Sequence, residues 1–283
     1  MPSKKISSKR ISSKLLTTSG AMAPVAPDAM ASLTTPSKFV FSTVPVNTLG
    51  ATEYTLATIV VDESGSVSGF QKELERCLKT VLGSCTGTSK KPNPRSDNLL
   101  LRAMAFSDDV REIHGFRPVN DIKTDEYTGA VTIRGCTALY DAVTSAVEAS
   151  EVLGKNLVDQ EFTANAVIYV ITDGCDNRSS TTPKTIRKAL DRVAKSEKLA
   201  SIAVILIMVG ASDAGAKSEL DKFVADAALT QFVDLTSLFA SASPEKALGI
   251  LAGLISKSVS STSTSLASGS KGASAAASSK LTF

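Results

Sequence analysis

Five side chains that carry oxygen donors stand in predicted loops of this chain: Asp62, Ser64, Ser66, Thr137 and Asp173. The first three follow the apolar stretch Leu56–Val61, and the last follows a second apolar stretch, Ala166–Thr172. Two carboxylates and three hydroxyls are hard oxygen ligands, which Mg²⁺ and Mn²⁺ prefer, with water or an outside ligand completing six positions. The residue types therefore predict a site for one divalent cation.

The elements that must position this site are strands that end at one edge of a sheet. In an open parallel sheet, ligands bind outside the carboxyl ends of the strands, where loops distant in the sequence converge. In the stretch Leu56–Val61, both alternating sets of positions hold apolar or β-branched residues, which is typical of a central strand covered on both faces. We therefore expect the three loops to meet at this edge.

The three loop segments resemble, in the same order, the metal-ion-dependent adhesion site of a von Willebrand factor A (vWA) domain. Asp-x-Ser-x-Ser occupies 62–66, Gly-Cys-Thr-Ala-Leu-Tyr-Asp occupies 135–141, and Thr-Asp-Gly occupies 172–174. The resemblance covers roughly residues 53–256 and depends on all three segments, since a Ser-rich loop with one acid also occurs in ordinary turns. Cys136 stands where the family often has a glycine, and Cys175 follows the third segment, but neither change removes a ligand.

The resemblance implies a protein-binding function. In this family the open coordination position of the cation accepts an Asp or Glu carboxylate from a partner, so the metal bridges two proteins. An enzyme would need a general base or nucleophile beside the metal. Glu63 lies between two ligands and is expected to point away from the cation, Asp141 is expected to brace its helix, and Asp176 is a further candidate. We therefore expect a binding module and not an enzyme.

Apolar stretches typical of strands alternate with amphipathic stretches typical of helices. Strands are expected at 56–61, 99–106, 110–116, 166–172, 202–209 and 231–235, and helices at 68–83, 139–154, 182–197, 218–228 and 243–255. Ser68 and Gln71 form a predicted capping box, and the second and third strands form a predicted hairpin. This order indicates a doubly wound α/β fold, a mostly parallel, Rossmann-like sheet of the vWA type with one antiparallel edge strand.

Two low-complexity tails flank the expected domain. Residues 1–50 form a basic arm rich in Ser and Pro, residues 51–257 the vWA domain, and residues 258–283 a tail rich in Ser and Ala. The first 38 residues hold six cations and one acid, and residues 257–283 hold three cations and no acid, so the net charge of +3 leaves −5 for residues 39–256. An acidic domain suits a cation site better than a groove that follows phosphates. The tails have compositions that gain order only against a partner.

The remaining reactive residue types exclude other chemistry. The four cysteines form no Cys-x-x-Cys pair and no cluster with histidine, so we expect reduced thiols of a cytoplasmic protein and no zinc site. The single histidine, His114, is expected to be structural. No apolar run reaches the length of about eighteen residues that a transmembrane segment needs. Residues 1–20 lack the apolar core of a secretory signal, although their composition also suits a transit peptide.

Two functions remain open from the sequence. In the first, a divalent cation bridges the domain to an acidic residue of a partner protein within a multiprotein assembly. In the second, the chain is a structural subunit of a bacterial or phage assembly, held by its tails, and the metal only braces loops. A third hypothesis assigns the basic arm to nucleic acid or to an anionic surface. Sensitivity of partner binding to a chelator distinguishes the first function from the second.

Overall fold

A single mixed sheet of eight strands forms the centre of the molecule. The computed structural model describes residues 30–88, 91–94, 96–196, 198–210, 214–243, 246–247, 249–255 and 259. The strand order is β1-β2-β7-β6-β3-β8-β9-β10. The strands are β1 (Ala31–Thr34), β2 (Val40–Thr43), β3 (Glu53–Asp62), β6 (Leu99–Phe106), β7 (Val110–Pro118), β8 (Thr163–Thr172), β9 (Ile202–Met208) and β10 (Gln231–Asp234). A two-stranded ribbon, β4 (Gly87–Thr88) with β5 (Lys91–Pro92), lies apart from this sheet.

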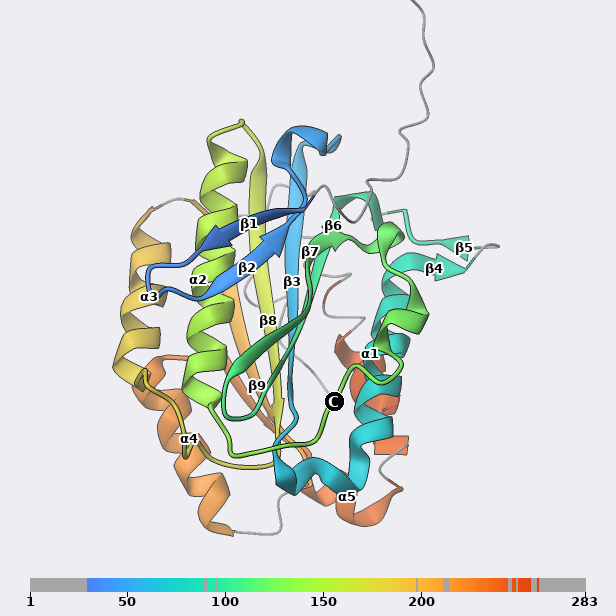
Figure 1. Ribbon diagram of the computed structural model, residues 1–283, viewed down its shortest axis with the longest axis vertical. Helices are drawn as coiled ribbons and strands as arrows, with labels where there is room; N and C mark the ends of the chain where they lie inside the picture. The colour runs from blue at the N-terminus through green and yellow to red at the C-terminus, as the bar shows by residue number, and fades with distance from the viewer. Residues whose placement is uncertain are drawn as a thin grey trace, which may run out of the picture.

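Helices cover both faces of the sheet (Figure 1). The α-helices are α1 (Gln71–Thr86), α2 (Leu139–Val158), α3 (Pro183–Ser196), α4 (Ala214–Ala227) and α5 (Thr236–Ser241). Helices α2, α3 and α4 pack on one face, and α1 packs on the other together with helical residues 249–255. Short 3₁₀ helices join the elements, among them η3 (Gly65–Phe70) after β3 and η6 (Thr124–Tyr127) beside α1. The predicted α/β fold of the vWA type is confirmed.

The central strands align the ends from which the site is built. Strand β3 runs parallel to β6 and to β8, and its last residues pair with Phe106 and Ile171. Both faces of these strands are buried, because their side chains alternate between two apolar clusters that the two helical layers complete. The loops after β3 and β8 therefore begin side by side at one edge.

Three predicted helix boundaries differ from the structure. Ser68 lies in η3, so the predicted capping box with Gln71 does not form, and the Gln71 amide instead donates to the Val131 carbonyl at 2.6 Å. Helix α1 continues past Gly83 to Thr86, and α2 continues past Gly154 to Val158. A Cβ on Gly154 would lie 2.5 Å from a Leu199 methyl group, so this glycine permits close packing and does not end the helix.

Part of the predicted N-terminal arm belongs to the sheet. Strands β1 and β2 form an antiparallel hairpin beyond β7, which is itself antiparallel to β6 as expected. Phe41 of β2 is fully buried and meets Phe116 edge to face, with ring centroids 6.2 Å apart. The turn of the hairpin lies against α2, where Ser37 donates two hydrogen bonds to the Glu148 carboxylate. Residues 1–29 of the predicted arm, and residues 258 and 260–283 of the predicted C-terminal tail, lie outside the described residues.

Candidate functional site

Backbone hydrogen bonds hold the three predicted loops together. The loop after β3 contacts the loop before α2 through the Gly65 amide, which donates to the Gly135 carbonyl at 3.3 Å. The loop before α2 contacts the loop after β8 through Thr137, whose amide donates to the Asn177 side chain at 2.8 Å and whose carbonyl accepts from the Asn177 amide at 3.0 Å. The sequence prediction that these loops meet at one edge is therefore confirmed.

Four of the five predicted ligands form one continuous chain of hydrogen bonds. Asp62 accepts from the Ser64 amide at 2.8 Å, and the hydroxyls of Ser64 and Ser66 lie 3.1 Å apart. Ser66 in turn donates to Asp173 at 2.8 Å. Asp62 and Ser64 are buried, Asp173 is half-buried and Ser66 is exposed, so the chain leads from the core to the surface.

Thr137 completes the set from the third loop. Its side chain is buried, and its backbone is fixed by Asn177 as described above. No hydrogen bond to another described residue engages the Thr137 hydroxyl. The hydroxyl is therefore available to an added ligand.

The electrostatics of the two carboxylates fit a cation. Burial raises the pKa of Asp62 to about 6, against hydrogen bonds from Ser64 and Thr172 that lower it, and the nearby Asp173 raises it further. Burial also raises the pKa of Asp173. No described arginine or lysine forms an ion pair with either carboxylate. Two uncompensated carboxylates with adjacent hydroxyls match the oxygen donors that Mg²⁺ or Mn²⁺ takes.

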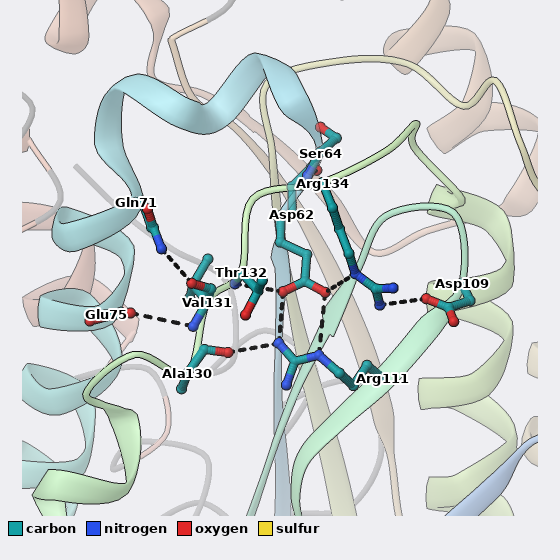
Figure 2. A network of polar contacts seen from close by, with 11 residues as sticks. Asp62, Ser64, Gln71, Glu75, Asp109, Arg111, Ala130, Val131, Thr132 and Arg134 are labelled. Carbon is teal, nitrogen blue, oxygen red and sulfur yellow. Dashed lines mark hydrogen bonds and ion pairs between the residues drawn. The ribbon is translucent and has the colours of Figure 1, made fainter.

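Glu63 points away from the hydroxyls and into an arginine network. Its carboxylate is completely buried and lies 2.7 Å from an Nη of Arg111 and 3.4 Å from Nε of Arg134. The Thr132 amide also donates to it at 2.9 Å. Figure 2 shows how this network ties Arg111 and Arg134 to the strand end, and how Arg134 reaches Asp109 at its outer side. The expected orientation of Glu63 is confirmed.

The network also supports the loop that carries Thr137. The Arg134 amide donates to the Glu63 carbonyl at 2.8 Å, and Arg111 donates to the Ala130 carbonyl at 2.7 Å. On the opposite side, Gln71 and Glu75 of α1 contact the backbone of Val131 (Figure 2). The segment from 130 to 134 is therefore fixed between β3, β7 and α1, and it positions the start of the loop at Gly135.

Asp141 and Asp176 both organise the segment after β8. Asp141 accepts hydrogen bonds from the amides of Ser180 and Thr181, at 3.0 and 2.8 Å. It therefore braces this segment, whereas the sequence suggested that it braces its own helix. Asp176 accepts from the amide of Tyr140 and from the hydroxyl of Ser179. Each of these two carboxylates thus joins α2 to the loop that follows Asp173.

Three residues have supporting roles that the sequence did not predict. Thr172 donates from its hydroxyl to Asp62 at 2.6 Å, Asn177 holds Thr137, and Asp108 accepts from the Cys136 amide at 3.0 Å. Gly135 has φ of 62°, and a Cβ there would lie 2.0 Å from the Asp108 carboxylate, so the turn requires glycine. The place of Thr172 as the last residue of a buried strand is a usable signal, whereas the roles of Asn177 and Asp108 depend on loop geometry.

A cleft of about 580 Å³ opens beside this chain of oxygen donors. It lies between η3, the loop after β8, the loop after β9 and the first two turns of α4. Its described lining consists of Ser66, Phe70, Asp173, Gly174, Cys175, Asp176, Asn177, Gly210, Gly215, Ala216 and Glu219. Ser66 and Asp173 belong to both the cleft and the candidate site, so the two features are continuous.

The remaining reactive residue types are cysteine and histidine. All four cysteines are free thiols; Cys77 and Cys85 are buried, Cys175 is half-buried and Cys136 is exposed. His114 is buried in β7, where its imidazole lies 2.7 Å from the Tyr127 hydroxyl and 2.9 Å from the Gly115 carbonyl. Within the described ranges, no group of three or more His, Cys, Asp or Glu side chains is placed to hold a metal. The candidate site depends on hydroxyls for most of its donors.

Comparison with known proteins supports the fold. No family model and no curated protein matches the sequence. Among solved structures, the PilB minor pilin from Streptococcus sanguinis matches with a TM-score of 0.50 and 15% identity over 75% of this chain. The pilus adhesin SpaC from Lactobacillus rhamnosus GG matches with a TM-score of 0.49 and 12% identity over 75% of this chain. Proximal thread matrix protein 1 from the mussel byssus matches with a TM-score of 0.43 and 17% identity over 71% of this chain.

These neighbours are longer than the segment they share with this chain. The match spans 62% of PilB, 31% of SpaC and 46% of the mussel protein. At such low identity the PilB match establishes a shared fold and carries no information on activity or partners. In the described part of the chain, no helix is long and apolar enough to cross a membrane.

Proposed function

We propose that this protein is a metal-dependent protein-binding module. Mg²⁺ or Mn²⁺ would be held by Asp62, Ser64, Ser66, Thr137 and Asp173 and would offer an open coordination position to an Asp or Glu carboxylate of a partner protein. The single observation that supports this most is the convergence of two uncompensated carboxylates and a chain of hydroxyls at one loop edge. The cation would supply electrophilic attraction for the partner's carboxylate.

The surroundings of the site favour binding over catalysis. The buried carboxylate nearest in sequence, Glu63, is engaged by Arg111, Arg134 and the Thr132 amide. Asp141 and Asp176 are engaged by the loop after β8. A general base must reach the proton it removes, and these carboxylates are already used as structural acceptors. We therefore propose that the protein is not an enzyme.

Titration calorimetry with Mn²⁺ tests the metal assignment directly. Asp62→Ala should abolish Mn²⁺ binding while circular dichroism still shows a folded α/β protein, because Asp62 supplies one of only two carboxylates. Asp125→Asn alters an exposed acid of η6 whose side chain makes no hydrogen bond to another described residue, so it is the matched control and should bind Mn²⁺ as the unaltered protein does. Unchanged Mn²⁺ affinity in Asp62→Ala would refute the assignment.

The chelator experiment separates this proposal from the structural alternative. Binding of a partner through the cation requires metal, so an affinity pull-down in Mg²⁺ should lose that partner in EDTA. If the chain is instead a structural subunit held by its tails, light scattering should show an assembly whose size does not change in EDTA. That assembly should dissociate when residues 1–29 and 260–283 are removed. That result, without any chelator-sensitive partner, would favour the structural function.

A further inference from the structure

The cleft beside the candidate site has the dimensions of a binding subsite. Its volume of about 580 Å³ exceeds the space that a single side chain fills, and three of its described lining residues, Gly174, Gly210 and Gly215, carry no side chain. Gly210 has φ of 64°, and a Cβ there would come within 3.1 Å of the Phe70 ring, so a larger residue would narrow the cleft. A group that enters the cleft lies next to Ser66 and Asp173.

The charge of the cleft is of one sign. Its described lining includes Asp173, Asp176 and Glu219 and no lysine, arginine or histidine. The one cation of the adjoining loop, Arg178, does not line the cleft and lies 3.9 Å from Asp108. The negative potential extends to Tyr140, whose pKa is raised by burial first and then by Asp176, Cys175 and Glu219.

A bound cation would not remove this charge. A divalent ion balances Asp62 and Asp173, and a partner's carboxylate then adds one negative charge next to Asp176 and Glu219. Asp176 already accepts hydrogen bonds from Ser179 and Tyr140, whereas Glu219 is exposed on α4 and accepts none from a described residue. A partner with only acidic residues would therefore meet like charge at the cleft, while a neighbouring basic group would offset it.

We infer that the partner is recognised through a pair of opposite charges, a carboxylate at the cation and a lysine or arginine side chain in the cleft opposite Glu219. This inference rests on the proposed metal-dependent function and specifies its partner. The cation fixes the acidic residue, and the cleft selects among acidic segments. A run of acidic residues alone is predicted to bind less tightly than a segment in which an acid has a basic neighbour.

Fluorescence polarisation with synthetic nonapeptides tests this inference. Each peptide has a glycine and serine background, a central Glu, and Lys, norleucine or Glu at one position within three residues on either side. In Mg²⁺, the best Lys peptide should bind the unaltered protein about fivefold more tightly than its norleucine counterpart, as for one exposed ion pair. Glu219→Lys should remove that preference and favour the peptide with a second Glu.

Two controls separate the possible failures. Asp221→Lys makes the same charge change on α4 at an exposed residue outside the cleft, and it should leave the preference for Lys intact. Mn²⁺ affinity should be the same in all three proteins. Equal binding of Lys and norleucine peptides, with binding still lost in EDTA, would refute the subsite and leave the proposed function standing. If no peptide bound in a Mg²⁺-dependent manner, the proposed function and the subsite would fail together.

Discussion

Asp62 and Glu63 are neighbours in sequence, yet their carboxylates have opposite surroundings. Both are buried, but Glu63 is neutralised by two arginines, whereas within the described residues Asp62 accepts hydrogen bonds from an amide and a hydroxyl and has no arginine or lysine partner. The alternation of a strand end sends the two side chains to opposite sides. One carboxylate thereby anchors the loops, and the other is a ligand of the cation site that we propose.

Neutralising Glu63 should weaken both the fold and the site. In Glu63→Gln, Arg111 and Arg134 lose their buried partner, and we expect a loss of about 2 kcal/mol, below the full cost of a buried pair because both arginines are partly exposed. The segment from 130 to 134 would loosen, so Mn²⁺ affinity should fall as well. Urea unfolding in EDTA and calorimetry measure the two effects.

Asp109→Asn is the matched control for this prediction. It removes only the outer, exposed contact of Arg134 and should change stability by less than about 1 kcal/mol. If Glu63→Gln lost stability but bound Mn²⁺ as before, the network would support the fold without positioning the site.

At the scale of elements, β7 joins the hairpin to the rest of the sheet through two special positions. Gly115 allows β2 to approach, since a Cβ there would lie 2.1 Å from the Ser42 carbonyl oxygen. The adjacent His114 packs against Tyr127 of η6 on the side of α1. Strand β7 therefore contacts β2, which precedes it by about 70 residues, and η6, which follows it closely in the sequence.

Gly115→Ala should displace the hairpin. The clash involves backbone atoms, so it cannot be relieved by a rotamer change, and we expect a loss of at least about 2 kcal/mol in free energy of unfolding. Gly83→Ala is the control, because nothing lies within 4 Å of its added Cβ and the residue is within α1. That variant should be neutral or more stable by up to about 1 kcal/mol. Equal stability of the two variants would contradict the observed contact.

The free energy of unfolding should decrease as the pH is lowered, because His114 becomes protonated. Burial lowers its pKa from 6.5 to about 4, with further effects from the backbone, Arg117, Glu126 and Arg102. Between pH 6.5 and about pH 4, the imidazole binds a proton in the unfolded chain but not in the folded protein. The stabilisation present above pH 6.5 is therefore lost as the pH falls towards 4. The loss approaches about 3 kcal/mol at the lower end.

The comparison of His114→Phe with the unaltered protein isolates this effect. The Phe variant loses the hydrogen bond to Tyr127 and should be less stable at pH 7. Its free energy of unfolding should nevertheless decline less steeply between pH 7 and pH 4.5, because the other titrating groups are common to both proteins. Parallel curves would show that His114 is protonated in the folded state at its ordinary pKa.

The sequence predicted the elements that depend on a local pattern and missed those that depend on distant contacts. Strands such as β3 and β8 are apolar over most of their length and were identified within a few residues. The hairpin β1–β2 was assigned to the arm, because its four-residue strands lie among prolines and their partners, Gly115 and Phe116, are about 70 residues away. The meeting of the loops that carry the proposed ligands was predictable from the strand ends, but the support from Asn177 was not.

Because the hairpin β1–β2 belongs to the sheet, the stable domain begins closer to the N-terminus than residue 51. Arg102 is almost completely buried below the hairpin, with its guanidinium 5.6 Å from the Phe41 ring centroid and 2.8 Å from the Glu112 carboxylate. The same carboxylate accepts from the Ser42 amide at 3.0 Å. The hairpin thus covers a charged pair that would be open to water without it.

Two truncated proteins should therefore differ sharply. Removal of residues 1–29 leaves the hairpin in place, and we expect a free energy of unfolding within about 1 kcal/mol of the full chain. Removal of residues 1–45 also deletes Phe41 and exposes Arg102, and the loss should exceed about 3 kcal/mol, the cost of truncating a buried phenylalanine. Circular dichroism follows the urea unfolding, since the chain has no tryptophan. Phe41→Ala in the full chain serves as a control and should reproduce most of the larger loss. If both truncated proteins unfolded at the same urea concentration, the hairpin would be an appendage, and the domain would begin near residue 51 as its composition suggests.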